Sequence, residues 1–184
     1  QAPFYIFTAF VFSYGITELR ISRQLLLVSV LAAAVVSFFT IPIAGHLSDR
    51  FGRKKVYLVG AVMVGVYAWI YFALLNSAVP FLIFIGIVVS LIPHDTMYGP
   101  QAALIAESFT GRLRYSGASI GYQLASVIAG GPAPLIATAL LAAYHFWLPI
   151  AVYITICAII SIAATVMMPD YTNRDISAEY AHTM

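Results

Sequence analysis

Two ionisable side chains stand together in the middle of an apolar stretch, where His94 and Asp95 follow Pro93. An imidazole beside a carboxylate can bind, share or relay a proton. If the stretch is a membrane helix, the pair lies roughly 12 residues, or ~18 Å, from its charged end. Burying ionisable groups at that depth costs free energy, and they are retained mainly where they line a water-filled path, pair with each other or relay a proton. The pair is therefore either a substrate or proton site or a buried brace that holds a kink at Pro93.

Two polar side chains extend this candidate site along the same stretch. In a helix, Tyr98 and Gln101 follow His94 at i+4 and i+7, so all three share one face. They are expected to line a common cavity, as contacts for a substrate or as part of a proton pathway.

Other apolar stretches carry three more candidates for the substrate or proton pathway. Ser119 and Gln123 form a polar face on a stretch that also carries small residues at every fourth position. Gln123 either contacts a substrate or makes an interhelical hydrogen bond worth ~1 kcal/mol. Tyr5 belongs to an aromatic-rich first stretch, which either lines a cavity or packs against other helices.

Five charged side chains gather between Gly45 and Lys55, at the junction of two long apolar stretches. The bilayer core excludes such a concentration of charge, so the run is expected to be a short loop in water on the cytoplasmic side. Two glycines suit the tight turns that a loop this brief requires. The run contains Gly45, Asp49, Arg50, Gly52, Arg53, Lys54 and Lys55.

The sequence has no arrangement typical of catalysis or of a bound cofactor. It contains no glycine-rich phosphate loop, no cluster with metal-ligand spacing and no nucleophile elbow, and its Ser, His and Asp residues are scattered among separate stretches. Cys157 is the single cysteine and lies in an apolar stretch, which excludes an intramolecular disulfide and disfavours a cysteine-ligated metal site. No enzymatic activity, catalytic residue, metal or cofactor is therefore expected.

The composition is that of a membrane protein. Of the 184 residues, 62% are hydrophobic and 9% are charged, and the mean hydropathy is +0.94. A soluble domain with a polar surface cannot be built from these residues, so an all-α, multi-pass protein of the lipid bilayer is expected. The formal charge is only +2, and the basic residues stand in short connections instead of covering one face. Nucleic acid is therefore excluded as a partner.

Six apolar segments are each roughly long enough to cross the ~30 Å hydrocarbon core of a bilayer. Pro93 and Gly99–Pro100 are expected to break the fourth segment, and Gly130–Pro132 to loosen the fifth. The chain begins with Gln1 and is apolar at once, so we interpret it as a fragment that starts inside or just before a helix. The expected helices span about residues 3–17, 24–44, 56–75, 79–106, 115–143 and 147–168, followed by a polar tail at 169–184.

Lysine and arginine are distributed unevenly between the two ends of these segments. Seven fall on one side, and only Arg20 and Arg23 fall on the other. Positive charge collects in cytoplasmic loops, so the first side is expected to face the cytoplasm, together with the tail at 169–184. The seven are Arg50, Arg53, Lys54, Lys55, Arg112, Arg114 and Arg174.

The charged run, read as G-x-x-x-D-R-x-G-R-K, resembles the signature loop of the major facilitator superfamily, which joins the second and third helices of a half-transporter. The stretches Met97–Ala103, Glu107–Phe109 and Arg112–Gln123 resemble the metabolite:proton symporter family, whose members carry small organic acids, shikimate, proline or betaines. The resemblance runs from about Tyr14 to Met168. It implies the carboxy-terminal six-helix half-bundle of such a transporter, residues 1–168, built as a three-plus-three inverted repeat.

The resemblance also implies a cytoplasmic gate. In this superfamily the aspartate of the loop and its neighbouring cations pair with charges at other cytoplasmic helix ends and close the inner side. A further partner of Asp49 is expected in the missing amino-terminal six-helix half, at a helix N-terminus whose dipole attracts the carboxylate. The alternative is a loop that only fixes topology through positive charge. The implied gate comprises Gly45, Asp49, Arg50, Gly52, Arg53, Lys54, Glu107, Arg112 and Arg114.

The function implied by the resemblance is that of a proton-coupled symporter in the inner (plasma) membrane. Its partners would be a small-molecule substrate, such as an organic acid, and a proton, and two six-helix bundles would rock against each other to alternate access. Two alternatives stay open. One is a uniporter or exporter on the same scaffold without proton coupling, and the other is a membrane sensor that does not transport.

Overall fold

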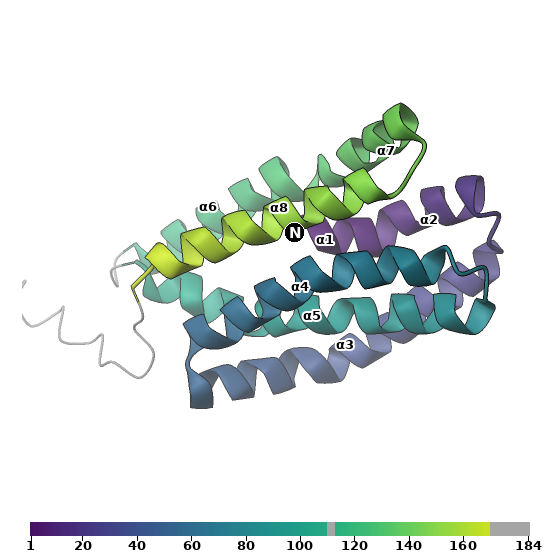
Figure 1. Ribbon diagram of the computed structural model, residues 1–184. Coiled ribbons are helices and arrows are strands. Elements are labelled where there is room, and N and C mark those ends of the chain that lie inside the picture. Colours follow the sequence, from purple (N-terminus) through teal and green to yellow (C-terminus); the bar gives the residue numbers. More distant parts are fainter. Residues whose placement is uncertain (110–112, 170–184) are drawn as a thin grey trace, which may run out of the picture.

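The structure is a computed structural model that describes residues 1–109 and 113–169, and the regular elements within these ranges are all helices. The helices lie side by side along one common direction (Figure 1). Within these described ranges, five spans are long and apolar enough to cross a membrane. They are Arg23–Phe51, Arg53–Leu75, Pro80–Glu107, Arg114–Tyr144 and Leu148–Met167.

A shorter helical segment precedes these spans and is built from α and π pieces that follow one another without a gap. It buries Phe7, Phe10 and Tyr14, whose exposed fractions are at most 3%. The ring of Phe7 lies 4.6 Å from the ring of Tyr71, so the aromatic residues of this segment pack mainly into the core. The pieces are α1 (Ala2–Tyr5), η1 (Ile6–Phe10), α2 (Val11–Ser13) and η2 (Tyr14–Glu18).

The first two long helices, α3 (Arg23–Phe51) and α4 (Arg53–Leu75), meet at a single glycine. The Ser22 hydroxyl caps the start of α3 by accepting a hydrogen bond from an amide of its first turn. Gly52 has φ +106°, a conformation that suits glycine and strains other residues. Its amide donates to the carbonyl of Ser48 and closes the last turn of α3. The connection is therefore one residue long.

The expectation of a charged loop from Gly45 to Lys55 is wrong. Apart from Gly52, the whole run is helical. Gly45 lies within α3 and makes no turn. It faces Gly99 of the neighbouring helix, where an added Cβ would come within 2.7 Å of the Gly45 nitrogen. Gly45 therefore lets two helices approach each other closely. The sequence alone does not distinguish a glycine with this role from one that makes a turn.

The third long helix, α5 (Pro80–Glu107), runs without interruption through Pro93 and Pro100, so the expected break is wrong. Each proline removes one amide donor from the helix ladder and would weaken an isolated helix. α5 packs against both α3 and α4, and it buries both prolines. Tertiary packing therefore keeps the helix intact where local preference predicts an end.

The last two spans complete the bundle. The fourth begins as α6, widens into the π-helix η3 and turns at Gly131 and Pro132 before α7 continues it. The amide of Gly131 donates to the carbonyl of Ser126 and closes the π turn at 2.9 Å. The bounds are α6 (Arg114–Ala125), η3 (Ser126–Gly130), α7 (Ala133–Tyr144) and α8 (Leu148–Met167).

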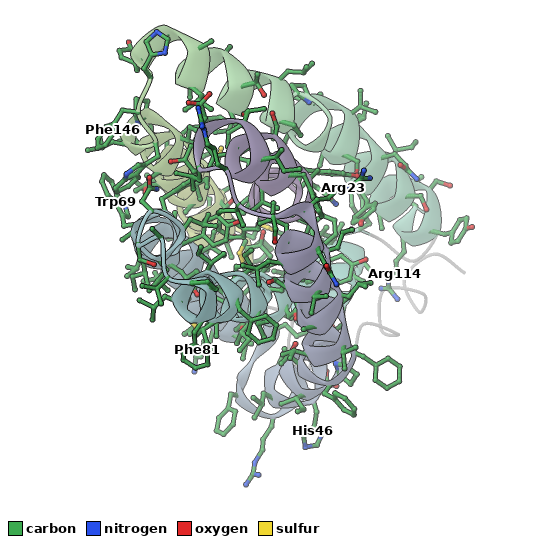
Figure 2. The ribbon with its side chains drawn as sticks, turned by 90° about the vertical axis from the view of Figure 1, so that its right-hand side faces the viewer. Arg23, His46, Trp69, Phe81, Arg114 and Phe146 are labelled. Atoms are coloured by element: carbon green, nitrogen blue, oxygen red, sulfur yellow. The ribbon has the colours of Figure 1, made fainter. Side chains whose placement is uncertain are left out.

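Most of the described charged residues gather at one end of the bundle. The junction of α3 and α4, the start of α6 and the end of α8 lie at one end, and the connections from α2 to α3, α4 to α5 and α7 to α8 lie at the other (Figure 1). In Figure 2, His46 and Phe81 point away from the bundle, and Phe81 is 68% exposed. Many other large apolar side chains are also exposed, so apolar surface covers much of the outside, as a bilayer requires.

Candidate functional site

Two cavities flank the middle of α5, and His94 and Tyr98 line both of them. The first has a volume of ≈ 470 Å³ and lies between α5, α3 and the start of the chain. The second has a volume of ≈ 380 Å³ and lies toward α4, η3 and α8. Both volumes suit a small solute. Polar groups reach the first cavity from Tyr5, Ser37, His94, Asp95, Tyr98 and Tyr122.

The carboxylate of Asp95 is fully enclosed, with an exposed fraction of 1%, and its two oxygens have different partners. The Thr40 hydroxyl donates to Oδ2, and Nδ1 of His94 lies 3.1 Å from Oδ1. Thr40 belongs to α3, so the carboxylate joins α3 to α5. An unpaired buried carboxylate would be strongly destabilising, and these two hydrogen bonds offset part of that cost.

The imidazole of His94 is oriented by Asp95 and by two aromatic rings. Its centroid lies 5.5 Å from the ring of Tyr98, which stacks on it, and 5.1 Å from the ring of Phe4. With Asp95 ionised, its oxygens can only accept hydrogen bonds, so the hydrogen between the two side chains would be carried by Nδ1 of His94. Nε2 is then an acceptor in the neutral ring and a donor in the protonated one.

The second cavity brings together the three residues that share one face of α5. His94, Tyr98 and Gln101 lie along its wall. Tyr57 of α4 and Ser161 of α8 line the same cavity. The face that the spacing predicts is therefore present, and it borders a cavity instead of a packed interface.

Ser119 and Gln123 lie apart from His94 and Asp95. Both are exposed on α6 and line neither cavity. Two residues that sequence reasoning missed, Ser37 and Thr40, do belong to the site, because they reach it from α3. The available signal was a pair of hydroxyl residues three positions apart in the apolar middle of α3.

At the charged end of the bundle, Arg53 joins three helix ends. Its Nη2 lies 2.9 Å from Oδ1 of Asp49, at the end of α3, and its Nη1 pairs with Oε1 of Glu107, at the end of α5. The side chain of Asp49 is 62% exposed, whereas that of Glu107 is only 11% exposed. The pair with Glu107 is therefore the better shielded one, and Asp49 presents its charge toward the solvent.

Lys54 extends this charged cluster to a fourth helix. Its Nζ donates to the carbonyls of Val166 and Met168 at 2.9 and 2.6 Å, where α8 ends. A cation at a helix C-terminus satisfies free carbonyls and complements the helix dipole. Arg50 stays exposed, with its guanidinium 5.7 Å from the ring centroid of Phe51.

The remaining residues of the implied gate are placed differently. Arg114 begins α6, and its Nε and Nη2 atoms are buried without a hydrogen-bond partner among the described residues. Arg112 lies outside the described residues. In the described part of the chain, Asp49 pairs with neither of the expected partners, Glu107 and Arg114. Arg53 pairs with both Asp49 and Glu107 and so links the two carboxylates.

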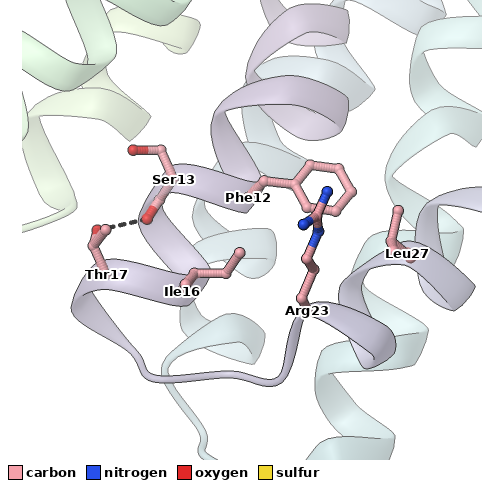
Figure 3. Close-up of a pocket in the computed structure, with 6 residues that line it drawn as sticks. All are labelled: Phe12, Ser13, Ile16, Thr17, Arg23 and Leu27. Atoms are coloured by element: carbon pink, nitrogen blue, oxygen red, sulfur yellow. Dashed lines mark hydrogen bonds between the residues drawn. The ribbon is translucent and has the colours of Figure 1, made fainter.

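A third cavity, of ≈ 500 Å³, lies at the opposite end of the bundle beside the start of α3 (Figure 3). There the side chain of Arg23 extends toward the ring of Phe12, and the Thr17 hydroxyl donates to the Ser13 carbonyl at 2.5 Å. Arg23 and Thr17 are both exposed, so this cavity belongs to the surface and is separate from His94.

These features suit binding and proton exchange more than the making of covalent bonds. The described residues contain no group of three or more His, Cys, Asp or Glu side chains that could hold a metal ion. The central site offers hydroxyls, one imidazole and one carboxylate beside two cavities. The charged cluster holds the ends of four helices together at one face of the bundle.

Comparison with known proteins places the chain among transporters. Residues 2–180 match the family model described as Major Facilitator Superfamily. The chain is 35% identical to the shikimate transporter of Escherichia coli (strain K12) over 90% of its length. It is 32% identical to the citrate-proton symporter of Klebsiella pneumoniae over 75% of its length, and 28% identical to the proline/betaine transporter of Escherichia coli (strain K12) over 95%.

The chain spans 38%, 31% and 35% of the lengths of these three relatives, in the same order. It matches no solved structure. The relatives are transporters and not enzymes, which confirms that expectation for the chain. A relative named as an inner membrane metabolite transport protein, from Escherichia coli (strain K12), is 32% identical over 73% of the chain, and agrees with the apolar spans. The chain is therefore a multi-pass inner-membrane protein that belongs to the Major Facilitator Superfamily, within its metabolite:proton symporter family.

Proposed function

We propose that the chain is the carboxy-terminal six-helix half of a secondary active transporter, and that the intact protein carries a small polar metabolite together with a proton. The observation that carries this proposal is the enclosed Asp95 carboxylate, paired with His94 at the wall of two cavities in a membrane-length helix. Such groups are costly within a bilayer and are retained chiefly for ion or substrate pathways.

The proposed proton site is His94, with Asp95 as its partner. The imidazole can exchange a proton at Nε2 while Nδ1 stays bound to the carboxylate. Both cavities reach this ring, so a proton there can respond to a solute in either one. The proposed substrate class is a small hydroxylated or carboxylated metabolite, as the names of the shikimate and citrate relatives suggest.

The proposed inner gate is the charged cluster of Asp49, Arg53, Lys54 and Glu107. Arg53 and Lys54 bind the ends of α3, α5 and α8, and the exposed Asp49 is available to a partner outside the chain. Breaking those contacts would let the helix ends separate on the side that we propose faces the cytoplasm. Rocking of two bundles would then open this side as the other side closes.

The proposed partner of this chain is a second six-helix bundle, which α3 and the span from Arg114 to Tyr144 face. These two spans are the least enclosed, with 17% and 22% of their apolar windows buried against 28–44% in the other three. α6 also exposes Ser116, Ser119 and Gln123, polar groups that a lipid-facing helix would avoid. The length of the relatives leaves room for such a bundle.

Uptake assays with the intact gene product test the function. Cells that lack their own carriers for shikimate, citrate, proline and glycine betaine would express it and receive each solute in radiolabelled form. We expect saturable uptake of at least one of the first two solutes, and its loss when a protonophore collapses the proton gradient. Correctly inserted protein that takes up none of the four solutes would contradict the proposal and favour a membrane sensor.

A further inference from the structure

Buried serine and threonine side chains in these helices follow one pattern, and Ser37 departs from it. Ser29, Ser90 and Thr165 each donate a hydrogen bond to a backbone carbonyl of the preceding turn, at 2.6–2.7 Å. Ser37 is also buried, with an exposed fraction of 9%, yet its hydroxyl has no hydrogen-bond partner among the described residues. Unlike these neighbours, Ser37 therefore makes no hydrogen bond to a backbone acceptor of its own helix.

Ser37 lines the first cavity beside the proposed proton site. It shares the cavity wall with His94 and Asp95, and it stands one helical turn before Thr40, which already donates to Asp95. Rings of Phe4 and Phe38 line the same space. A ligand in this cavity would therefore meet an unused hydroxyl next to apolar ring faces.

The charges around this cavity favour one kind of ligand group. Its described lining contains the carboxylate of Asp95 and the imidazole of His94, but no lysine or arginine. A ligand carboxylate placed at Ser37 would lie near Asp95, with only a protonated His94, already paired with Asp95, to offset the repulsion. A ligand hydroxyl meets no such penalty, and it can both donate to and accept from the serine oxygen.

We propose that Ser37 contacts the transported solute and recognises one of its hydroxyl groups. This inference rests on the proposed transport function and adds a specificity-determining residue and a substrate class, a small hydroxylated solute about the size of one ring. The aromatic side chains cover the carbon skeleton of the solute, and Ser37 distinguishes a hydroxyl from hydrogen at one position. A carboxylate on the same solute points away from Asp95.

Competition kinetics with the intact protein test this contact. The probes are radiolabelled shikimate or citrate, with cyclohex-1-ene-carboxylate or tricarballylate as the matched competitor that lacks hydroxyl groups. Ser37→Ala should raise KM about tenfold with a maximal rate within about twofold, because one hydrogen bond to the solute is lost. The variant should also discriminate less against the competitor, whereas Ser37→Thr, which keeps the hydroxyl, should retain most of both properties.

Ser29→Ala is the matched control, since Ser29 is a buried serine of the same helix whose hydroxyl bonds to its own backbone. It should leave KM and discrimination unchanged. Equal kinetic constants for Ser37→Ala and the parent protein would overturn the inference and leave transport intact. Transport of only proline or glycine betaine, which have no hydroxyl group, would also overturn it, and absence of all uptake would instead contradict the proposed function.

A chemical probe covers the case in which Ser37→Ala fails to accumulate. Ser37→Cys would be made in a transporting background from which the other cysteines, Cys157 included, have been removed, because Cys157 lines the second cavity. A small methanethiosulfonate reagent should modify the new thiol, and saturating substrate should slow the reaction several-fold. Modification at a rate that substrate does not change would place Ser37 outside the solute path and overturn the inference.

Discussion

The carboxylate of Asp95 contacts Thr40 on α3 and His94 on α5, so a single side chain joins two helices and is also the partner of the proposed proton site. This double role makes its substitutions informative. A hydrogen bond to a charged group is worth ~1.5–3 kcal/mol, which is enough to change either stability or transport measurably. The two roles differ in which quantity changes.

Asp95→Asn and His94→Gln separate these roles. Each variant keeps a hydrogen-bonding group of similar size and removes the ability to titrate. We expect normal amounts of protein in the membrane. Gradient-driven uptake should be roughly tenfold slower, which corresponds to ~1.4 kcal/mol, and its dependence on pH should be flatter. Initial rates across external pH, normalised to immunodetected protein, measure this. Reduced protein with an unchanged KM and pH profile would instead identify the pair as a structural brace.

Asp49 tests the charged cluster at the same scale. Asp49→Asn removes the charge on the exposed side of Arg53, and an ion pair this exposed contributes at most ~1 kcal/mol to stability. The variant should therefore accumulate normally yet transport about tenfold more slowly, because the proposed gate loses its partner. Lys55→Gln removes an exposed charge from the same region and is the control that should transport normally. Equal uptake by both variants would leave the cluster with a role in topology alone.

At the scale of helices, α3 and α5 approach each other closely around Gly99. An added Cβ there would lie 2.7 Å from the nitrogen of Gly45, 2.8 Å from the carbonyl oxygen of Ile41 and 2.9 Å from Cβ of Ala44. Two of these atoms are backbone and cannot rotate aside. The small residues thus bring Thr40 within reach of Asp95, four positions before Gly99.

Gly99→Ala should accordingly separate α3 from α5. We expect a marked loss of folded protein, measured as the temperature of aggregation in detergent extracts, because backbone must shift to admit the methyl group. Gly121→Ala provides the comparison, since a Cβ at Gly121 would meet nothing within 4 Å. Equal thermal stability of the two variants would show that the helices are not held at this distance in the membrane.

The helices themselves could be predicted from the apolar runs, because burying backbone in a bilayer requires them. The site could be predicted only in part. The spacing of His94, Tyr98 and Gln101 places them on one face, and they do border one cavity. Thr40 and Ser37 reach the site through tertiary packing, and Gly45 gives no local sign of whether it turns or packs. Continuous helix through Pro93 likewise depends on neighbours that a local pattern does not contain.

For the whole molecule, the charges at one end imply an orientation in the membrane. Single cysteines at His46 and Ala78 should report opposite sides, because both positions are exposed and lie near opposite ends of the bundle. In intact cells an impermeant thiol reagent should label Ala78→Cys and spare His46→Cys until the membrane is opened. Ser48 is unsuitable for this purpose, since it is 2% exposed. Labelling of His46→Cys in intact cells would reverse the orientation.

Proton coupling is best tested with the purified intact protein in liposomes that contain a pH-sensitive dye. Addition of the transported solute outside, without an imposed gradient, should acidify the lumen as protons enter with it, and Asp95→Asn should slow that acidification about tenfold while solute binding persists. Solute entry at the normal rate with no change in internal pH would contradict proton symport through His94 and Asp95, and would leave a uniporter on the same helical scaffold.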